Sequence, residues 1–220
     1  MTTIEHPVRE LFDTLLAAYG PRHWWPARTV PEMMIGAILV QNTAWTGAER
    51  AVRRLEEAGL LNAWEGLRAT SEEILGELIR PAGFFRVKSG RLQALARFMA
   101  GFGDDHTRLF ALPTASLRRV LLAVHGVGKE TADAMLCYAA QRPIFVVDAY
   151  TRRIYHRLGW CDEKAGYDHL QTLTSSRLPE DAALLGEMHA LLVEHAKRHC
   201  RARPVCSGCP VGFCPFHSRS

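Results

Sequence analysis

The sequence is short of several features that define whole classes of protein. No stretch of its 220 residues approaches the roughly 18 uncharged apolar residues of a membrane-spanning helix, so such a helix is excluded. Charged side chains at Glu5, Arg9, Glu10 and Asp13 interrupt the N-terminal segment, so we expect no signal peptide and a cytoplasmic protein. Hydrophobic residues make up 48% and charged residues 23%, and these ordinary globular values exclude a disordered chain.

The net positive charge is also small, and the excess of basic residues is unevenly distributed along the chain. The net charge is +4 at pH 7, yet residues 1–196 carry 22 basic and 23 acidic side chains. The whole excess therefore lies in the last 24 residues, together with four of the six cysteines. Cysteines clustered in a chain without a secretion signal favour metal binding or redox chemistry over disulfides. The other two, Cys137 and Cys161, are interpreted as packing thiols.

Apolar residues are spaced as in helices over most of the chain. Residues 117–124, for example, place two leucines and two valines at the i, i+3, i+4, i+7 positions of one helix face. Thr70 and Glu73 have the spacing of a capping box at a helix start. Alternating apolar and polar patterns are absent, and the short run 144–147 is interpreted as a buried linker. We therefore predict an all-α protein.

One segment between two helical patterns carries chemical information. Residues 124–131 read Val-His-Gly-Val-Gly-Lys-Glu-Thr, and Gly126 and Gly128 allow a sharp turn. Because the next helix starts at once, its first amides are free to bind an anion. The segment suits a nucleic-acid phosphate, a contact that fixes position and does not read base sequence. A plain helical hairpin with a glycine C-cap is the alternative.

An aspartate follows seventeen residues after Thr131. Asp148 precedes a helical pattern, where aspartate usually caps the helix and where the helix start stabilises its charge. The pattern Leu-x4-Gly-Val-Gly-x2-Thr-Ala followed by Val-Asp-x4-Arg resembles the helix–hairpin–helix DNA glycosylases. With the terminal cysteines it resembles their iron–sulfur branch, typified by endonuclease III, over about residues 25–214. The resemblance implies that Asp148 is catalytic, stabilising a cationic sugar and orienting a water molecule.

The resemblance also implies how the molecule is organised. We expect a six-helix domain over residues 30–144, and a second helical domain made of residues 1–29 and 145–220. The implied partner is double-stranded DNA containing a damaged base, bound by a monomer in the cleft between the domains, with no membrane involved. The hairpin residues expected at the DNA are Gly126, Val127, Gly128, Lys129 and Thr131.

One position departs from the bifunctional members of this family. They carry a lysine directly before the hairpin threonine, and its amine forms a Schiff base with the sugar that permits strand cleavage. Here that residue is Glu130, and Lys129 is turned away by about 100° around the helix. We therefore predict a monofunctional glycosylase that uses water, with weak or absent lyase activity. The alternatives are a bifunctional enzyme for oxidised pyrimidines and a non-catalytic DNA-structure binder.

Tryptophans are concentrated in two short segments. Trp24 and Trp25 are adjacent, Trp45 lies a short way downstream, and core packing is the plain explanation for them. These segments, with residues 128–139 and 189–197, resemble the 3-methyladenine DNA glycosylase branch of the superfamily. The resemblance implies a pocket for a flipped, cationic alkylated base, formed by Trp24, Trp25, Trp45, Glu130 and Lys197.

Three further residues are candidates for DNA contact. Gln41 ends an apolar helical run, and the resemblance implies that it fills the gap left by the flipped base. A local hydrogen bond at the helix end is the alternative for Gln41. Arg86 and Lys88 lie in residues 83–88, which resemble the family's second backbone-contacting loop, although a solvated charged loop fits equally well.

The terminal cysteines are closely spaced. Cys200, Cys206, Cys209 and Cys214 follow the pattern Cys-x5-Cys-x2-Cys-x4-Cys. Four thiolates within fifteen residues suit one tetrahedral or cubane site, which leaves zinc and a 4Fe–4S cluster as the choices. The resemblance favours a 4Fe–4S cluster with a structural role.

Overall fold

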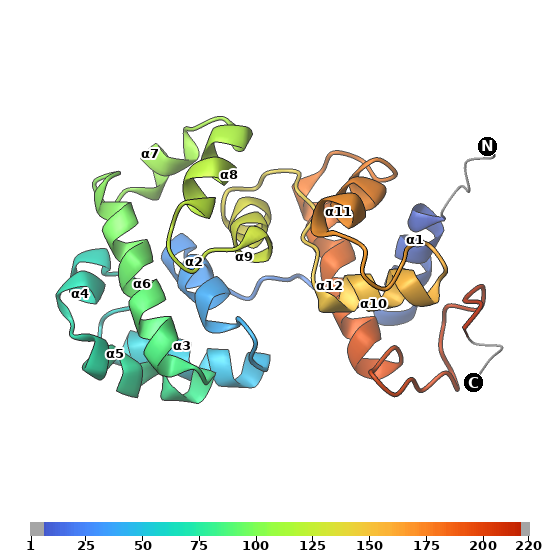
Figure 1. The fold of residues 1–220 in the computed structure, drawn as a ribbon, viewed down its shortest axis with the longest axis horizontal. Coiled ribbons are helices and arrows are strands. Elements are labelled where there is room, and N and C mark those ends of the chain that lie inside the picture. Colours follow the sequence, from blue (N-terminus) through green and yellow to red (C-terminus); the bar gives the residue numbers. More distant parts are fainter. Residues whose placement is uncertain (1–6, 217–220) are drawn as a thin grey trace. The chain divides into compact units, whose positions relative to one another are not determined.

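The structure is a computed structural model that describes residues 7–216 (Figure 1). Within this range all regular elements are helices and there is no strand, which confirms the predicted all-α class. Residues 1–6, which include Glu5, and residues 217–220 lie outside the described residues. No helix in the described part is both long and apolar enough to cross a membrane.

The chain divides into two compact units. The first unit contains the chain up to Trp24 and from Gln141 onward, and the second runs from Trp25 to Ala140. The predicted domain boundaries lay at residues 30 and 144, a few positions beyond each of these junctions. The polypeptide therefore passes between the units twice.

The first unit is built around one long helix. Its helices are α1 (Val8–Tyr19), α10 (Ala149–Arg157), α11 (Tyr167–Ser175) and α12 (Ala182–Arg198). Helix α12 packs against α1 and α10, and its inward face, which includes Leu185, Met188 and Leu191, is fully buried with the apolar face of α1. After α12 ends, residues 199–216 contain no helix, and Val211 is the hydrophobic side chain of this tail that joins the core.

The second unit surrounds a helix that is buried on all sides. All seven residues from Met33 to Leu39 in α2 are buried, as expected for an element that is apolar all round. Helix α6 packs against α4 and α5, and α2 packs against α3 and the π-helical segment η2. The elements are α2 (Val30–Leu39), α3 (Trp45–Glu57), α4 (Trp64–Ala69), α5 (Glu72–Ile79), η1 (Arg80–Ala82), α6 (Phe85–Ala100), α7 (His106–Phe110), α8 (Thr114–Leu122), α9 (Lys129–Ala134) and η2 (Met135–Ala139).

One predicted helix start is wrong by one residue. The Oγ of Ser71 caps α5 by accepting a hydrogen bond from the amide of Ile74 (3.3 Å). Thr70 instead closes α4, because its hydroxyl donates to the carbonyl of Gly66 at 2.7 Å. Two adjacent helices leave only one residue free to act as the cap, and the spacing of Thr70 and Glu73 alone did not show which.

The segment before Asp148 is the buried linker that the sequence predicted. Phe145, Val146 and Val147 are buried, and this segment is not a strand. Its backbone groups are bonded within the first unit: Gln171 donates to the carbonyl of Phe145 (2.8 Å), and the amide of Val147 donates to the Tyr167 hydroxyl (3.4 Å). A fixed linker gives Asp148, the residue that follows it, a fixed position.

A buried ion pair joins the helices on either side of the hairpin. The carboxylate of Asp133 in α9 is fully buried and accepts two hydrogen bonds from Arg118 in α8, at 2.6 Å from Nε and 2.9 Å from Nη2. Such a two-pronged pair fixes both distance and angle. It therefore holds the turn between α8 and α9 at one geometry.

Removing one partner of this ion pair should lower the stability of the folded protein. Asp133→Ala removes the carboxylate that accepts two hydrogen bonds from the largely buried Arg118 guanidinium, so the free energy of unfolding should fall by about 3–5 kcal/mol. Urea unfolding followed by circular dichroism measures it. The exposed pair Glu77–Arg80 is the matched control, and Glu77→Ala should lower the free energy of unfolding far less, because solvent screens this pair. Equal losses for the two variants would contradict the structural role assigned to Asp133.

Candidate active site

The turn between α8 and α9 uses its two glycines for different purposes. Gly126 has φ +84°, a backbone conformation that glycine adopts without strain. Gly128 is extended (φ −91°, ψ 179°) and caps α9 without a side-chain hydrogen bond. A Cβ at Gly128 would meet no atom within 4 Å. Neither backbone conformation nor internal packing requires glycine at position 128, so the bare backbone there is open to an outside group.

The rest of the hairpin separates into buried and exposed positions. Val127 and Thr131 are buried and anchor the turn, whereas Lys129 and Glu130 are exposed in the first turn of α9. The predicted hairpin residues therefore lie in one continuous segment of the second unit. Its exposed part combines the start of a helix with one cationic side chain.

Gln41 reaches this hairpin from the end of α2. Its amide nitrogen donates to the carbonyl of Gly126 at 3.0 Å and to the hydroxyl of Thr131 at 2.8 Å. Its carbonyl oxygen accepts a hydrogen bond from Nη1 of Arg91 in α6. The structure thus brings Gln41 and the hairpin together, although they are 85 residues apart in the chain.

Three aromatic side chains meet in the second unit. The ring centroids of Trp25 and Trp45 lie 5.3 Å apart at 84°, and that of Tyr138 lies 5.7 Å from Trp25. Gly36 in α2 makes room for Trp25, because a Cβ there would lie 3.4 Å from the indole. All three rings are half-buried. Electron-rich rings that are partly accessible can bind a planar or cationic group.

The other predicted pocket residues are distributed over both units. Trp24 and Lys197 belong to the first unit, where Trp24 is half-buried and Lys197 is exposed near the end of α12. Glu130 is exposed in the second unit. Of the five predicted pocket residues, Trp25 and Trp45 are those between which the structure records a contact.

Asp148 caps α10 and keeps one carboxylate oxygen free of the cap. Oδ1 accepts from the amide of Thr151 (2.7 Å) and from its hydroxyl (2.9 Å). The same hydroxyl oxygen accepts from the amide of Asp148 (3.5 Å), which completes a capping box. Oδ2 lies 3.6 Å from Nε2 of His189, and the side chain is only 10% exposed. Burial alone raises the pKa of Asp148, but His189 and the Thr151 hydrogen bonds outweigh it and hold the pKa below its ordinary value. The carboxyl group is therefore ionised at neutral pH.

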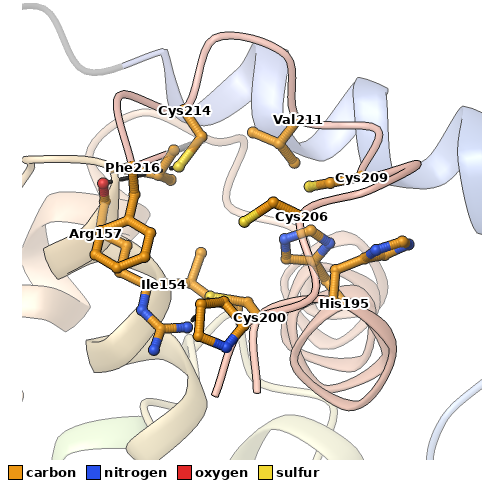
Figure 2. A pocket seen from close by; sticks show the side chains of 12 residues that line it. Ile154, Arg157, His195, Cys200, Cys206, Cys209, Val211, Cys214 and Phe216 are labelled. Atoms are coloured by element: carbon orange, nitrogen blue, oxygen red, sulfur yellow. Dashed lines mark hydrogen bonds between the residues drawn. The ribbon is translucent and has the colours of Figure 1, made fainter. Parts of the chain in front are cut away.

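The four terminal cysteines line one cavity in the first unit. Figure 2 shows Cys200, Cys206, Cys209 and Cys214 lining one pocket, which is partly open to solvent. None of the six cysteines forms a disulfide. Over residues 7–216, no three His, Cys, Asp or Glu side chains are gathered closely enough to hold a metal ion. The cysteines therefore share a cavity without being drawn together in it.

The surroundings of this cavity nonetheless fit an anionic metal cluster. Arg157 donates from Nη1 to Sγ of Cys200 (3.2 Å) and to the carbonyl of Arg201 (2.7 Å). A cation that donates a hydrogen bond to a ligand sulfur suits a negatively charged cluster held by cysteines. Cys137 lies outside this cavity, and burial and then the charge of Asp133 raise its pKa to about 12, as expected for a packing thiol.

The loop that was predicted to contact DNA through Arg86 and Lys88 places the two side chains differently. Arg86 is exposed. Lys88 is only 1% exposed, and its ammonium donates to the carbonyls of Leu39 and Ala82, each at 2.7 Å. This corrects the predicted phosphate contact of Lys88, because the ammonium ties the loop to the end of α2. At the loop tip, Phe84 has φ +47° and is 66% exposed.

The buried lysine predicts a pH dependence of stability. Burial, aided by the nearby charge of Arg91, lowers the pKa of Lys88 from 10.5 to about 8. The unfolded chain therefore binds this proton more tightly than the folded one. Between pH 8 and 10 the free energy of unfolding should rise with pH, by up to about 1.4 kcal/mol per unit. Urea unfolding of the wild type, Lys88→Met and the exposed-lysine control Lys164→Met measures it; a slope retained in Lys88→Met would contradict the assignment.

The comparison with known families identifies the chain. Residues 35–180, well over half of it, match the family described as HhH-GPD superfamily base excision DNA repair protein. The chain belongs to the HhH-GPD superfamily. The predicted relationship to helix–hairpin–helix DNA glycosylases is thereby confirmed, and the turn between α8 and α9 lies inside the matched region.

This HhH-GPD protein is similar to several DNA repair proteins over most of its length. It is 43% identical to "Putative DNA repair glycosylase MJ1434" of Methanocaldococcus jannaschii, over 94% of this chain and 95% of the relative. It is 28% identical to endonuclease III of Thermotoga maritima, over 85% and 83%. The structure of H. pylori 3-methyladenine DNA glycosylase (MagIII) bound to 1,N6-ethenoadenine has a TM-score of 0.77 at 27% identity and covers 87% of this chain and 97% of that one. A trapped endonuclease III–DNA covalent intermediate has a TM-score of 0.82 at 22% identity, with 96% of each chain covered, and shows the shared fold.

Several residues that shape the site of this HhH-GPD protein were not predicted. They are Arg91 beside Gln41, Tyr138 beside Trp25, the Arg118–Asp133 pair and His189 beside Asp148. One of them had a visible signal, because Asp133 is a charge inside an otherwise apolar helical segment. The others become meaningful only when the fold brings distant positions together.

Proposed function

We propose that this HhH-GPD protein is a monofunctional DNA glycosylase that removes alkylated bases from duplex DNA by hydrolysis. One observation carries the proposal: position 130, directly before the hairpin threonine, holds an exposed carboxylate where a lyase needs an amine. A carboxylate cannot form a Schiff base with the sugar. Water is then the nucleophile that the chain's own residues support.

Asp148 is the residue that we assign to this hydrolysis. As the bond between base and sugar breaks, the sugar gains positive charge, and the ionised carboxylate stabilises it. The water oxygen bonds to the anomeric carbon, its proton passes to the carboxylate, and the base leaves with the bonding electron pair. The capping bonds go to Oδ1, so we assign this chemistry to Oδ2, which lies 3.6 Å from Nε2 of His189. His189 and Thr151 support the role because they keep the carboxyl group ionised.

The preference for alkylated bases is supported by the aromatic cluster. A base alkylated on a ring nitrogen is already cationic, so it leaves readily and binds well to electron-rich rings. Trp25, Trp45 and Tyr138 provide such rings within one unit. We also propose that Trp24, Lys197 and Glu130 contact the flipped base. The H. pylori relative was solved with 1,N6-ethenoadenine, a modified adenine, and this agrees with a pocket for purines.

DNA binding is assigned to the hairpin and to Arg86. The open backbone at Gly128 lets a phosphate approach the start of the following helix, and Lys129 adds a positive charge. Gln41 would occupy the gap in the duplex once the base has left the stack. Flipping is required because the bond to be cleaved is not accessible inside a duplex.

We also propose that Cys200, Cys206, Cys209 and Cys214 hold a 4Fe–4S cluster. The support is that the four sulfurs surround one cavity and that Arg157 lies against one of them. When bound, the cluster would supply structural cross-linking of the tail. Val211 joins the core, and Arg157 donates to the carbonyls of Arg201 and Ala202, so such a link would add to the contacts that hold residues 199–216.

The lesion preference is tested with duplexes that contain one modified base. The proposal expects release of free 3-methyladenine and no release of an oxidised pyrimidine. Release of the oxidised pyrimidine alone would support an enzyme of the other substrate class. Release from neither duplex, with DNA binding retained, would leave a DNA-structure binder.

The role assigned to position 130 is tested by introducing a lysine there. Glu130→Lys should create an amine at the sugar, so borohydride should trap a covalent protein–DNA adduct that the wild type does not form. Glu130→Gln is the matched control and should form none. An adduct equally abundant in all three proteins would show that another amine, such as that of Lys129, is the nucleophile.

A further inference from the structure

Arg91 contacts the two features that the proposed function assigns to DNA deformation. Its guanidinium comes from α6 and donates to the side-chain oxygen of Gln41, 50 residues away in the chain. The same side chain lies directly over the hairpin, because a Cβ at Gly126 would sit 2.3 Å from its Cγ and 2.5 Å from its Cδ. Gly126 is thus required both by its positive φ and by the close approach of Arg91.

The amide of Gln41 has one orientation in this network. Its two N–H groups donate to the Gly126 carbonyl and the Thr131 hydroxyl, and its oxygen accepts from Arg91. A flipped amide would set its oxygen against the Gly126 carbonyl and its N–H groups against a guanidinium that can only donate. Arg91 and the Gly126 carbonyl therefore both hold the Gln41 amide in this orientation.

The arginine is kept at a cost to stability. Its Nε is buried and has no hydrogen-bond partner, and leaving a buried donor unsatisfied is unfavourable. Lys88, a second cation on α6, is pulled inward by two carbonyls and has its pKa lowered partly by Arg91. A position that crowds two cations and leaves one donor unpaired is not explained by packing.

We propose that Arg91 is a positioning residue that sets the side chain of Gln41 on the hairpin, so that Gln41 enters the DNA duplex in one orientation. This inference rests on the proposed function, because it takes Gln41 as the residue that fills the gap. Arg91 acts through Gln41 and needs no contact with the damaged base.

A double-mutant cycle tests this link without base release. The probe is a duplex with a tetrahydrofuran abasic-site analogue opposite 2-aminopurine, whose fluorescence reports the unstacking that follows insertion of Gln41. Arg91→Met and Gln41→Ala should each lower the fluorescence change at saturating protein by severalfold. The double variant should equal Gln41→Ala, because residues acting as one unit are non-additive. Arg91→Lys keeps the positive charge but loses the planar guanidinium group, so it should behave like Arg91→Met.

Other outcomes overturn the proposal. A further loss in the double variant, or full function of Arg91→Lys, would mean that Arg91 acts through its charge on the phosphates. A wild-type response from Arg91→Met would mean that it does not act on Gln41 at all. Urea unfolding of each variant, together with protection of the Gln41 side-chain amide protons in NMR spectra, separates a folding defect from lost positioning. Because the abasic duplex requires no catalysis, failure of base release would refute the proposed function and leave this test intact.

Discussion

Replacing Asp148 by asparagine should lower the rate of base release by at least about 10²–10³-fold while the protein still folds and binds duplex DNA. Asparagine has the shape of aspartate and caps helices equally well, so the hydrogen bond from the Thr151 amide should survive. What disappears is the negative charge that the positive sugar needs. Single-turnover release of a labelled base, with protein in excess over DNA, measures the chemical step.

A second helix cap provides the control for this variant. Asp181 caps α12 in the same unit, where its Oδ1 accepts from the amide of Leu184 at 2.9 Å, but it is exposed and is assigned no role in the chemistry. Asp181→Asn makes the same chemical change at an equivalent local position and should leave the rate unchanged. An Asp148→Asn protein that kept more than a tenth of the wild-type rate would contradict the catalytic assignment, whatever its stability.

Replacing one of the four cysteines that we propose as cluster ligands should remove the metal and expose the tail of the first unit to proteases. Cys206→Ala should purify without the equal amounts of iron and acid-labile sulfide expected of the wild type, and proteases should then cleave within residues 199–216. The physical reason is that this tail has no helix and places one side chain, Val211, in the core, so ligation of the proposed cluster should contribute strongly to its folding. Elemental analysis and limited proteolysis measure the two effects.

The control for this prediction is another cysteine of the same unit. Cys161 packs partly against the same core, but it does not line the cavity. Cys161→Ala should therefore keep its iron and its resistance to proteolysis. Zinc in place of iron in the wild type would replace the proposed cofactor, and a metal-free wild type that resists proteolysis would remove the need for one.

Structural features that depend on neighbouring residues could be predicted from the sequence. The hairpin, the Asp148 cap and the buried linker before it are each encoded by a few neighbouring residues, so their positions were predictable. The assignment of Lys88 to DNA failed because a charged residue in a loop usually faces water. Here the carbonyls of Leu39 and Ala82, whose positions depend on the packing of α2 and η1 against α6, draw it inward.

Contacts between residues that are distant in the chain could not be predicted from the sequence. Arg91 lies 50 residues from Gln41, and no periodicity connects them. Tyr138 was part of a recognised pattern, yet the π-helical segment that carries it shifts side chains away from the positions of a regular α-helix. Its approach to Trp25 therefore could not be derived from α-helical spacing.

One reaction tests the central claim most directly. The wild-type protein is incubated with a duplex that carries a single 3-methyladenine, in the presence of borohydride, and free base and protein–DNA adduct are measured in the same sample. Hydrolysis by water directed by Asp148 predicts released base in full and no covalent adduct. An adduct formed in proportion to released base would contradict it, because an amine would then be the nucleophile.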